Sequence, residues 1–320
     1  MTVRVYSSAD PGAPAVRGNT AGDIINLMDK CLVTGYGSKA GAGWTKPFTG
    51  TNVAAFKTGA GSNGMYLRIE EPVDTNTNYP SAKVRGYETM TDVNTGNGPF
   101  PAPSRLPNGL FWYKSYSGSA AADPRQWWVV ASESFVIFMI QTYPSQWSSS
   151  PGYYSELFMF GDLQNTGPND AYATIILGET STSGNSSQIW PMDSVNVAST
   201  RSGLYMPRAY TGIGGEIQAG WHHDYVKSGV SDWGSDSSYL QYPHGPDGAL
   251  YMSPVWVHQP GGTNAAAIRG TLPGVWVPLQ RGLARLDTFA GQGQLAGKNF
   301  LVWQHYTARA AIEISDTWGT

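Results

Sequence analysis

Charged side chains are scarce in this chain. Lys, Arg, Asp and Glu make up 13% of the residues, about half of the ~25% that is usual for globular proteins. Interface centres are poor in Lys, Asp and Glu and rich in aromatic residues, and aromatic residues reach 12% here. The composition therefore indicates that other chains cover much of the surface. With a formal net charge of −3 and no basic stripe for phosphates, we expect no nucleic-acid partner.

Cysteine and long apolar runs are also lacking. Cys31 is the single cysteine, so no disulfide bond within the chain is expected, and its place on an apolar helix face predicts a buried small side chain. No run of about 18 apolar residues exists, so we expect no membrane-spanning segment. The first residues, MTVRVYSSADPG, lack the apolar core and the cleavage site of a secretory signal.

Glycine, proline and aromatic residues are plentiful: 39 Gly, 21 Pro, 12 Trp and 18 Tyr. Aromatic residues favour strands, while Gly and Pro favour the turns between them. We therefore predict an all-β protein of mainly antiparallel sheets, sandwich-like or barrel-like, with one short N-terminal α-helix and long Gly/Pro-rich loops.

The helix is predicted from Thr20 onward. Thr20 suits an N-cap, and Asp23 resembles the acidic member of a capping box. Gly35 stands where a left-handed C-cap is expected. The apolar residues between these ends recur at three- and four-residue spacing, which predicts one buried face; they are Ile24, Ile25, Leu27, Met28, Cys31 and Leu32.

The segment from Gly59 to Gly64 reads G-x-G-x-x-G. A dinucleotide fingerprint of this form needs a strand before it and a helix after it. Here MYLRIEE follows, which alternates as a strand does. We therefore predict a hairpin connection between strands at 52–56 and 65–70.

The clearest hairpin in the chain is QWWVVASESFVIFMIQTY. Its strands are predicted at 127–131 and 134–144, with Glu133 and Ser134 at an exposed turn, and its continuous apolar pattern places it at the centre of a sheet. Residues 91–109 have the composition of a loop.

We predict that the chain is divided into a strand and extended arm (1–19), a helix with the main β region (20–180), and a second β region with variable loops (181–320). The alternative is one continuous domain.

Candidate chemistry is weak throughout. His222 and His223 are adjacent, so on a strand they point to opposite faces and do not chelate one metal ion. Carboxylate pairs for glycoside hydrolysis can be drawn from Glu70, Glu71, Asp162, Glu179 and Glu216, as in any all-β protein. Trp127, Trp128 and Trp276 lie inside predicted strands and are expected in the core or an interface. We therefore predict no catalytic residue, no cofactor and no metal site.

Several segments carry a resemblance to a known family. They are VYSSADPGAP, CLVTGYGSKAGAGWTKPFTGTNVAAFK, KVRGYETMTDVNTGNGPFP, ELFMFGDL, NDAYATIILG and IRGTLPGVWVPLQ. In this order they resemble virion structural proteins of tailed bacteriophages. The matches are spread over most of the chain, and the departures lie in residues 180–260.

The resemblance implies a non-enzymatic particle component of the tail or the neck-to-baseplate region, located in the virion after assembly in the host cytoplasm. Its expected partners are copies of itself, in multiples of three or six, and other virion proteins. The alternatives are a glycan- or receptor-binding tail protein, with a host surface glycan as ligand, and a polysaccharide-degrading enzyme. Aromatic residues and prolines of the arm and the variable loops are the candidate interface residues: Pro11, Pro14, Trp221, Trp233, Tyr239 and Tyr242.

Overall fold

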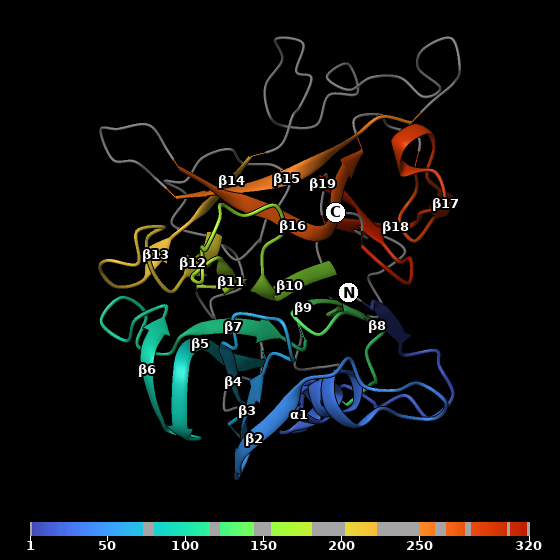
Figure 1. Ribbon diagram of the computed structural model, residues 1–320. Coiled ribbons are helices and arrows are strands. Elements are labelled where there is room, and N and C mark those ends of the chain that lie inside the picture. Colours follow the sequence, from blue (N-terminus) through green and yellow to red (C-terminus); the bar gives the residue numbers. More distant parts are fainter. Residues whose placement is uncertain are drawn as a thin grey trace.

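The computed structural model confirms the all-β prediction. It describes residues 2–72, 80–115, 122–143, 155–180, 202–222, 250–259, 267–278, 283–305 and 308–318. Within these ranges the chain forms two sheets, of 13 and six strands, in which all pairings are antiparallel, and one short α-helix. Figure 1 shows the larger sheet curled around the helix, with the smaller sheet packed on its other face.

The larger sheet places the predicted aromatic hairpin next to one of its edge strands, so the prediction of a central position is wrong. Its strands follow the order β1 (Arg4–Ser7), β8 (Trp127–Ala131), β9 (Phe135–Gln141), β10 (Ser155–Asp162), β11 (Thr174–Glu179), β7 (Leu110–Tyr113), β5 (Ser81–Asp92), β4 (Tyr66–Glu70), β3 (Val53–Lys57) and β2 (Thr45–Gly50). In addition, β12 (Ser202–Met206) pairs with β11 and with β13 (Ile217–Gln218), and β6 (Thr95–Phe100) pairs with β5. Every residue of β9 is buried, as expected for a strand covered on both faces.

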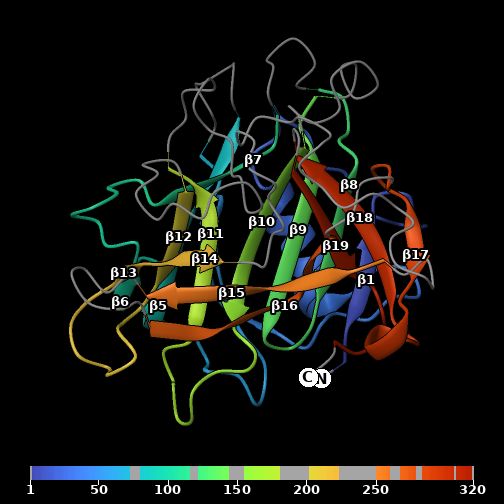
Figure 2. The same cartoon turned by 90° about the horizontal axis from the view of Figure 1, so that it is seen from above.

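The smaller sheet covers β8 to β12. Its order is β14 (Gly220–His222), β15 (Met252–Gln259), β16 (Ala267–Pro278), β19 (Ala308–Glu313), β18 (Asn299–His305) and β17 (Thr288–Ala290), and a 3₁₀ turn at Gly293–Leu295 precedes β18. Figure 2 shows β15 and β16 crossing over β9 to β12. Aromatic pairs join the layers: Trp128 contacts Trp303 with ring centroids 5.5 Å apart, and Phe135 contacts Trp318 at 6.0 Å.

The helix α1 (Asp23–Met28) continues as a π-helical turn, Asp29–Thr34, which Gly35 ends with φ 78°. The predicted apolar face is confirmed for five of its six residues, because Ile24, Leu27, Met28, Cys31 and Leu32 are all 0% exposed. Ile25 is half-buried. The predicted cap at Thr20 is wrong. The N-cap is Gly22, with φ 88° and no side-chain cap, and the Asp23 carboxylate instead accepts the backbone N–H of Arg17 at 2.8 Å.

The Gly59–Gly64 segment connects β3 to β4, as predicted. Several of its backbone amides donate to acceptors of the protein itself. The N–H of Gly59 donates to the Glu133 carbonyl at 2.6 Å, and the N–H of Asn63 donates to Asp162 Oδ2 at 2.6 Å. The connection therefore closes one end of the larger sheet.

Two further expectations are wrong. Residues 95–100 form β6 rather than loop, because the absent side chain at Gly96 admits the Tyr87 ring; a Cβ there would lie 2.6 Å from that ring. Ser134 is only 4% exposed, because the neighbouring strand β10 lies beside the turn, where the N–H of Asp162 donates to the Ser134 carbonyl at 2.9 Å.

The arm that follows β1 packs on the sheet of its own chain. Val16 is 0% exposed, and its carbonyl accepts the N–H of Arg125 at 2.8 Å. The Pro14 carbonyl accepts Trp127 Nε1 at 3.0 Å. One hydrophobic cluster includes residues of the arm, the helix and both sheets, and the change from the larger to the smaller sheet falls between β13 and β14.

Candidate functional site

A pocket of about 230 Å³ opens beside β15 and β16. There the two strands depart from regular pairing, because their register shifts between Pro254 and Trp256 and again between Val257 and His258. Irregularities of this kind bend a strand and re-aim its side chains. As a result, side chains from both strands line the same pocket.

Two glycines of β16 lie at or beside the pocket, and Gly274 lines it. Gly270 has φ 146° and Gly274 has φ 66°, values that side-chain-bearing residues rarely adopt. A Cβ at Gly270 would lie 2.5 Å from the Gln164 carbonyl oxygen, and a Cβ at Gly274 would lie 2.2 Å from Trp318 Nε1. Glycine at both positions therefore lets the neighbouring backbone and indole approach the strand.

One wall comes from the turn between β10 and β11. The backbones of Gln164 and Thr271 exchange two hydrogen bonds, of 3.0 and 2.7 Å. Asn165 donates through Nδ2 to Thr271 Oγ1 at 3.0 Å. A turn of the larger sheet is thus fixed to the middle of β16, with its two amide side chains at the pocket.

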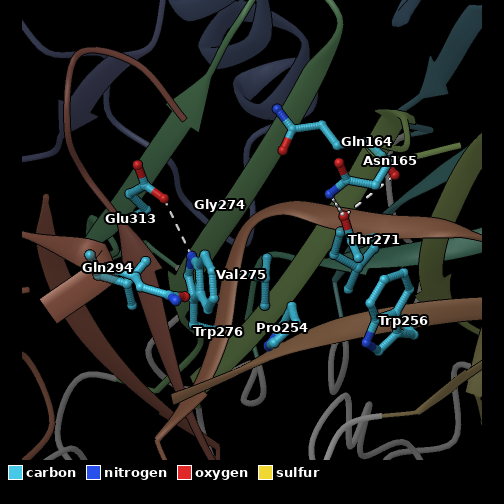
Figure 3. A pocket seen from close by; sticks show the side chains of 12 residues that line it. Gln164, Asn165, Pro254, Trp256, Thr271, Gly274, Val275, Trp276, Gln294 and Glu313 are labelled. Atoms are coloured by element: carbon cyan, nitrogen blue, oxygen red, sulfur yellow. Dashed lines mark hydrogen bonds between the residues drawn. The ribbon is translucent and has the colours of Figure 1, made fainter. Parts of the chain in front are cut away.

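A carboxylate is held at the other end of the pocket. Glu313 is 1% exposed; its Oε2 accepts Trp276 Nε1 at 3.3 Å, and its Oε1 lies 3.0 Å from Lys298 Nζ. These contacts fix the orientation of both the carboxylate and the indole. Figure 3 shows the resulting two groups: Trp276 with Gln294 and Glu313, and Trp256 with Thr271, Gln164 and Asn165.

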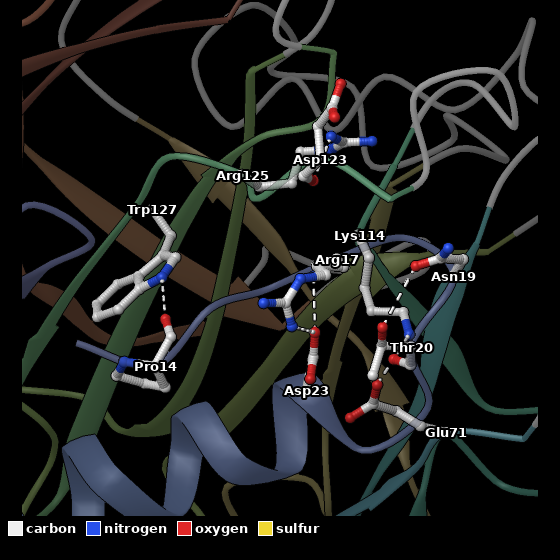
Figure 4. A network of polar contacts seen from close by, with 10 residues as sticks. All are labelled: Pro14, Arg17, Asn19, Thr20, Asp23, Glu71, Lys114, Asp123, Arg125 and Trp127. Atoms are coloured by element: carbon white, nitrogen blue, oxygen red, sulfur yellow. Dashed lines mark hydrogen bonds and ion pairs between the residues drawn. The ribbon is translucent and has the colours of Figure 1, made fainter. Parts of the chain in front are cut away.

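A second polar cluster lies at the start of α1, within the larger sheet (Figure 4). Glu71, which is 0% exposed, accepts the N–H of Ile25 at 2.7 Å and forms an ion pair with Lys114 at 3.0 Å. Lys114 Nζ also donates to the Thr20 carbonyl at 2.8 Å. Burial raises the pKa of Glu71, although Lys114 and the Ile25 amide oppose the rise. We assign this cluster a structural role, because its polar groups bond to other residues of the same chain.

Of the six predicted interface residues, the structure describes three. Pro11 is exposed and Pro14 half-buried, both on the N-terminal arm. Trp221 lies in β14, opposite Val257. The other three candidates, Trp233, Tyr239 and Tyr242, lie outside the described residues.

The five candidate carboxylates are held in different places. Glu179 is buried in β11. Glu70 pairs with Arg68 at 2.8 Å, Glu71 with Lys114 at 3.0 Å and Glu216 with Arg105 at 2.6 Å, and Asp162 accepts a hydrogen bond from Thr174 Oγ1 at 2.6 Å.

The tryptophans predicted for core or interface divide into three environments. Trp127 is 0% exposed, in the core of the larger sheet. Trp128 lies between the two sheets against Trp303. Trp276 is half-buried and lines the pocket.

His222 ends β14, opposite Trp256, while His223 lies outside the described residues. In the part of the chain that the structure describes, no group of three or more His, Cys, Asp or Glu side chains could hold a metal ion. Within the same ranges, no helix has the length and apolar character needed to cross a membrane.

Sequence reasoning missed the pocket. Gln164 and Asn165 belong to DLQNTGPND, which composition identifies only as a turn, and Glu313 lies 148 positions after Asn165 in the sequence, the difference of the two numbers. The sequence pattern identifies Trp276 only as a strand residue. No spacing links these positions, since strand pairing alone brings them together.

Comparisons with known proteins give no further assignment: no protein-family model matches the chain, and no curated protein matches it.

Proposed function

We propose that this protein is a structural component of a tailed-bacteriophage virion, assembled in several copies in the tail or neck-to-baseplate region. Its sequence segments resemble virion proteins and keep their order along the chain, and these segments form β1, most of the π-helical turn, β2, β3, β5, β6, β10, β11 and β16. The proposed partners are copies of the chain, in multiples of three or six, and other virion proteins. The proposed location is the virion.

Exposed apolar side chains at one end of the smaller sheet carry this proposal. Tyr210 is 60% exposed, Ile213 79% and Ile268 65%. The N–H of Tyr210 donates to Gln259 Oε1 at 3.1 Å, and Gln259 pairs with the residue before Ile268. Large apolar side chains that stay exposed can contribute to a protein–protein interface, so we name Tyr210, Ile213 and Ile268 the apolar edge.

The apolar edge is held in place by charged residues. Arg208 pairs with Glu88 through two bonds of 2.6 and 2.7 Å. Arg269 Nη1 donates to the Arg208 carbonyl at 2.9 Å. The turn that exposes Tyr210 and Ile213 is thus bound to both sheets. A preformed surface loses less entropy on association than a loose loop does.

The experiment measures assembly of the full chain. Sedimentation and native mass spectrometry should give an oligomer of three or six copies, and purified particles should contain the protein at a matching stoichiometry. Ile213→Asp and Ile268→Asp should lower the oligomer fraction and the incorporation into particles. Tyr251→Asp is the control, since Tyr251 is also exposed, at 43%, but precedes the opposite end of β15.

Two results would overturn the proposal. One is absence of the protein from purified particles of the phage that encodes it. The other is a monomer at high concentration whose incorporation is unaffected by either Asp substitution.

A further inference from the structure

The pocket beside β15 and β16 is lined by two tryptophans that are not fully buried. Trp112, Trp127 and Trp303 are at most 2% exposed, whereas Trp256 and Trp276 are half-buried at opposite ends of one hollow. Indole rings contribute large contact area and are enriched where proteins bind ligands. Two indole rings around one small pocket therefore indicate a ligand-binding site.

The polar groups of the pocket are amides and a carboxylate. Asn165 uses its Nδ2 to hold Thr271, and Gln294 extends from an exposed turn towards Trp276 (Figure 3). Glu313 is fixed between Trp276 and Lys298. Amide groups both donate and accept hydrogen bonds, while a carboxylate only accepts them.

We propose that this pocket binds one neutral sugar residue, a hexose or an N-acetylhexosamine, of a glycan. A sugar ring combines an apolar C–H face, which packs on the negative face of an indole, with hydroxyl groups that both donate and accept hydrogen bonds. The pocket offers both kinds of surface within about 230 Å³. The inference goes beyond assembly into a particle and rests on the pocket alone.

The lining disfavours other ligand classes. The described residues that line the pocket include no Lys or Arg, and Lys298 outside it is engaged by Glu313 at 3.0 Å, so a phosphate or a carboxylate ligand would lack a cationic partner. Proline-rich peptides also pack on Trp, but they need a long aromatic groove rather than a compact pocket with three amide side chains. Of these lining residues, Glu313 is the single carboxylate, whereas glycoside hydrolysis generally uses two. The pocket therefore suits binding.

The pocket is also preformed. The paired backbones of Gln164 and Thr271 fix the wall, and Gly270 and Gly274 allow the neighbouring residues to pack closely against β16. Trp276 is further held against Phe300, with ring centroids 6.4 Å apart. A rigid site pays less ordering entropy when a ligand binds.

The test is calorimetric titration and saturation-transfer NMR of the full chain with defined probes. The probes are the methyl glycosides of glucose, galactose, mannose, N-acetylglucosamine and N-acetylgalactosamine, with a synthetic oligoproline peptide in parallel. We expect saturable binding of at least one glycoside, with its ring protons in contact with the protein. Trp256→Ala and Gln294→Ala should each weaken that binding about tenfold or more, equal to about 1.4 kcal/mol.

Controls separate loss of binding from loss of fold. Gln294 is exposed, so Gln294→Ala should have the same melting temperature as the unaltered protein. Trp256→Phe keeps an aromatic face and should bind more tightly than Trp256→Ala. Tyr251→Ala removes an exposed aromatic ring outside the pocket and should leave binding unchanged.

Three results would overturn the proposal: no binding of any glycoside at its solubility limit, glycoside binding that survives both alanine substitutions, or saturable binding of oligoproline alone. Because the titration uses the isolated chain, none of them bears on assembly. A loss of assembly in the apolar-edge variants would in turn leave glycoside binding intact.

Discussion

At the scale of single residues, the most consequential feature is the buried carboxylate of Glu71. A six-residue helix leaves its first N–H groups without partners, and α1 has no side-chain cap of its own. Glu71 accepts one of these N–H groups from 46 positions away. Its negative charge also lies at the positive end of the helix dipole, and Lys114 compensates the charge.

Replacing Glu71 by Gln should destabilise the protein by about 3–5 kcal/mol, because Lys114 is then left as a buried cation without a charged partner. Urea unfolding measures the loss. The double variant Glu71→Gln, Lys114→Met should recover much of it. Glu70→Gln is the matched control, because its partnership with Arg68 is partly exposed, and such pairs contribute about 0–1 kcal/mol. Equal losses for the two single variants would contradict this account.

A second prediction concerns Glu156 in β10. It is 3% exposed, and its Oε2 has no hydrogen-bond partner among the described residues. Burial raises its pKa from 4.5 to about 8. Between these values the folded protein retains a proton that the unfolded chain has lost, so stability falls as pH rises, by at most about 1.4 kcal/mol per pH unit.

Glu156→Gln removes this titration. The variant should therefore gain stability relative to the unaltered protein from pH 5 to pH 8, and the difference should level off above the folded-state pKa. Urea midpoints measured at each pH provide the test. A difference that stays constant over this interval would exclude Glu156 as the source.

At the scale of elements, sequence patterns predicted the elements that are set by residues close together in the chain. The apolar spacing of Ile24 to Leu32 predicted the buried helix face, and the aromatic runs predicted β8 and β9. The helix cap was not predictable, since its acceptor comes from Glu71 after β4. The strand β6 was hidden because Gly96 and Gly98, typical of loops, are needed there for close packing. The pocket depends on bulges and on strand order, which no local pattern encodes.

The helix face gives the third prediction. Leu27 is 0% exposed, so Leu27→Ala should cost about 2–5 kcal/mol through lost burial and the cavity left behind. Chemical denaturation of the isolated protein measures this cost. Asn26→Ala changes the adjacent exposed position and should alter stability by about 0.5 kcal/mol at most. Similar losses at both positions would show that burial of this face is not the cause.

At the scale of the whole molecule, a buried ion pair connects the two sheets. Arg269 of β16 has a 0% exposed side chain and contacts Asp170, from the turn before β11, through bonds of 2.7 and 2.9 Å. This planar two-bond geometry belongs to the guanidinium group, and a Lys ammonium cannot reproduce it.

Arg269→Lys should therefore destabilise the protein although the charge is kept. Hydrogen bonds to charged groups contribute about 1.5–3 kcal/mol each, and we expect a loss in this range, seen as a lower melting temperature by calorimetry. Arg105→Lys is the matched control, because Arg105 is 49% exposed beside Glu216. If both variants melt alike, the pair does not hold the sheets together.

The contact between the two ends of the described chain has a consequence of a different kind. The N–H of Val3 donates to the Asp316 carbonyl at 2.7 Å, and Figure 2 shows the ends side by side. The backbone thus traces a nearly closed circuit. A short peptide linker could join these ends, and new termini could be placed at the exposed turn at Thr51. This circular permutation would keep every strand pairing but change the order of the strands in the sequence. The folding rate of such a permuted chain would measure how strongly connectivity, apart from contacts, governs the route to this structure.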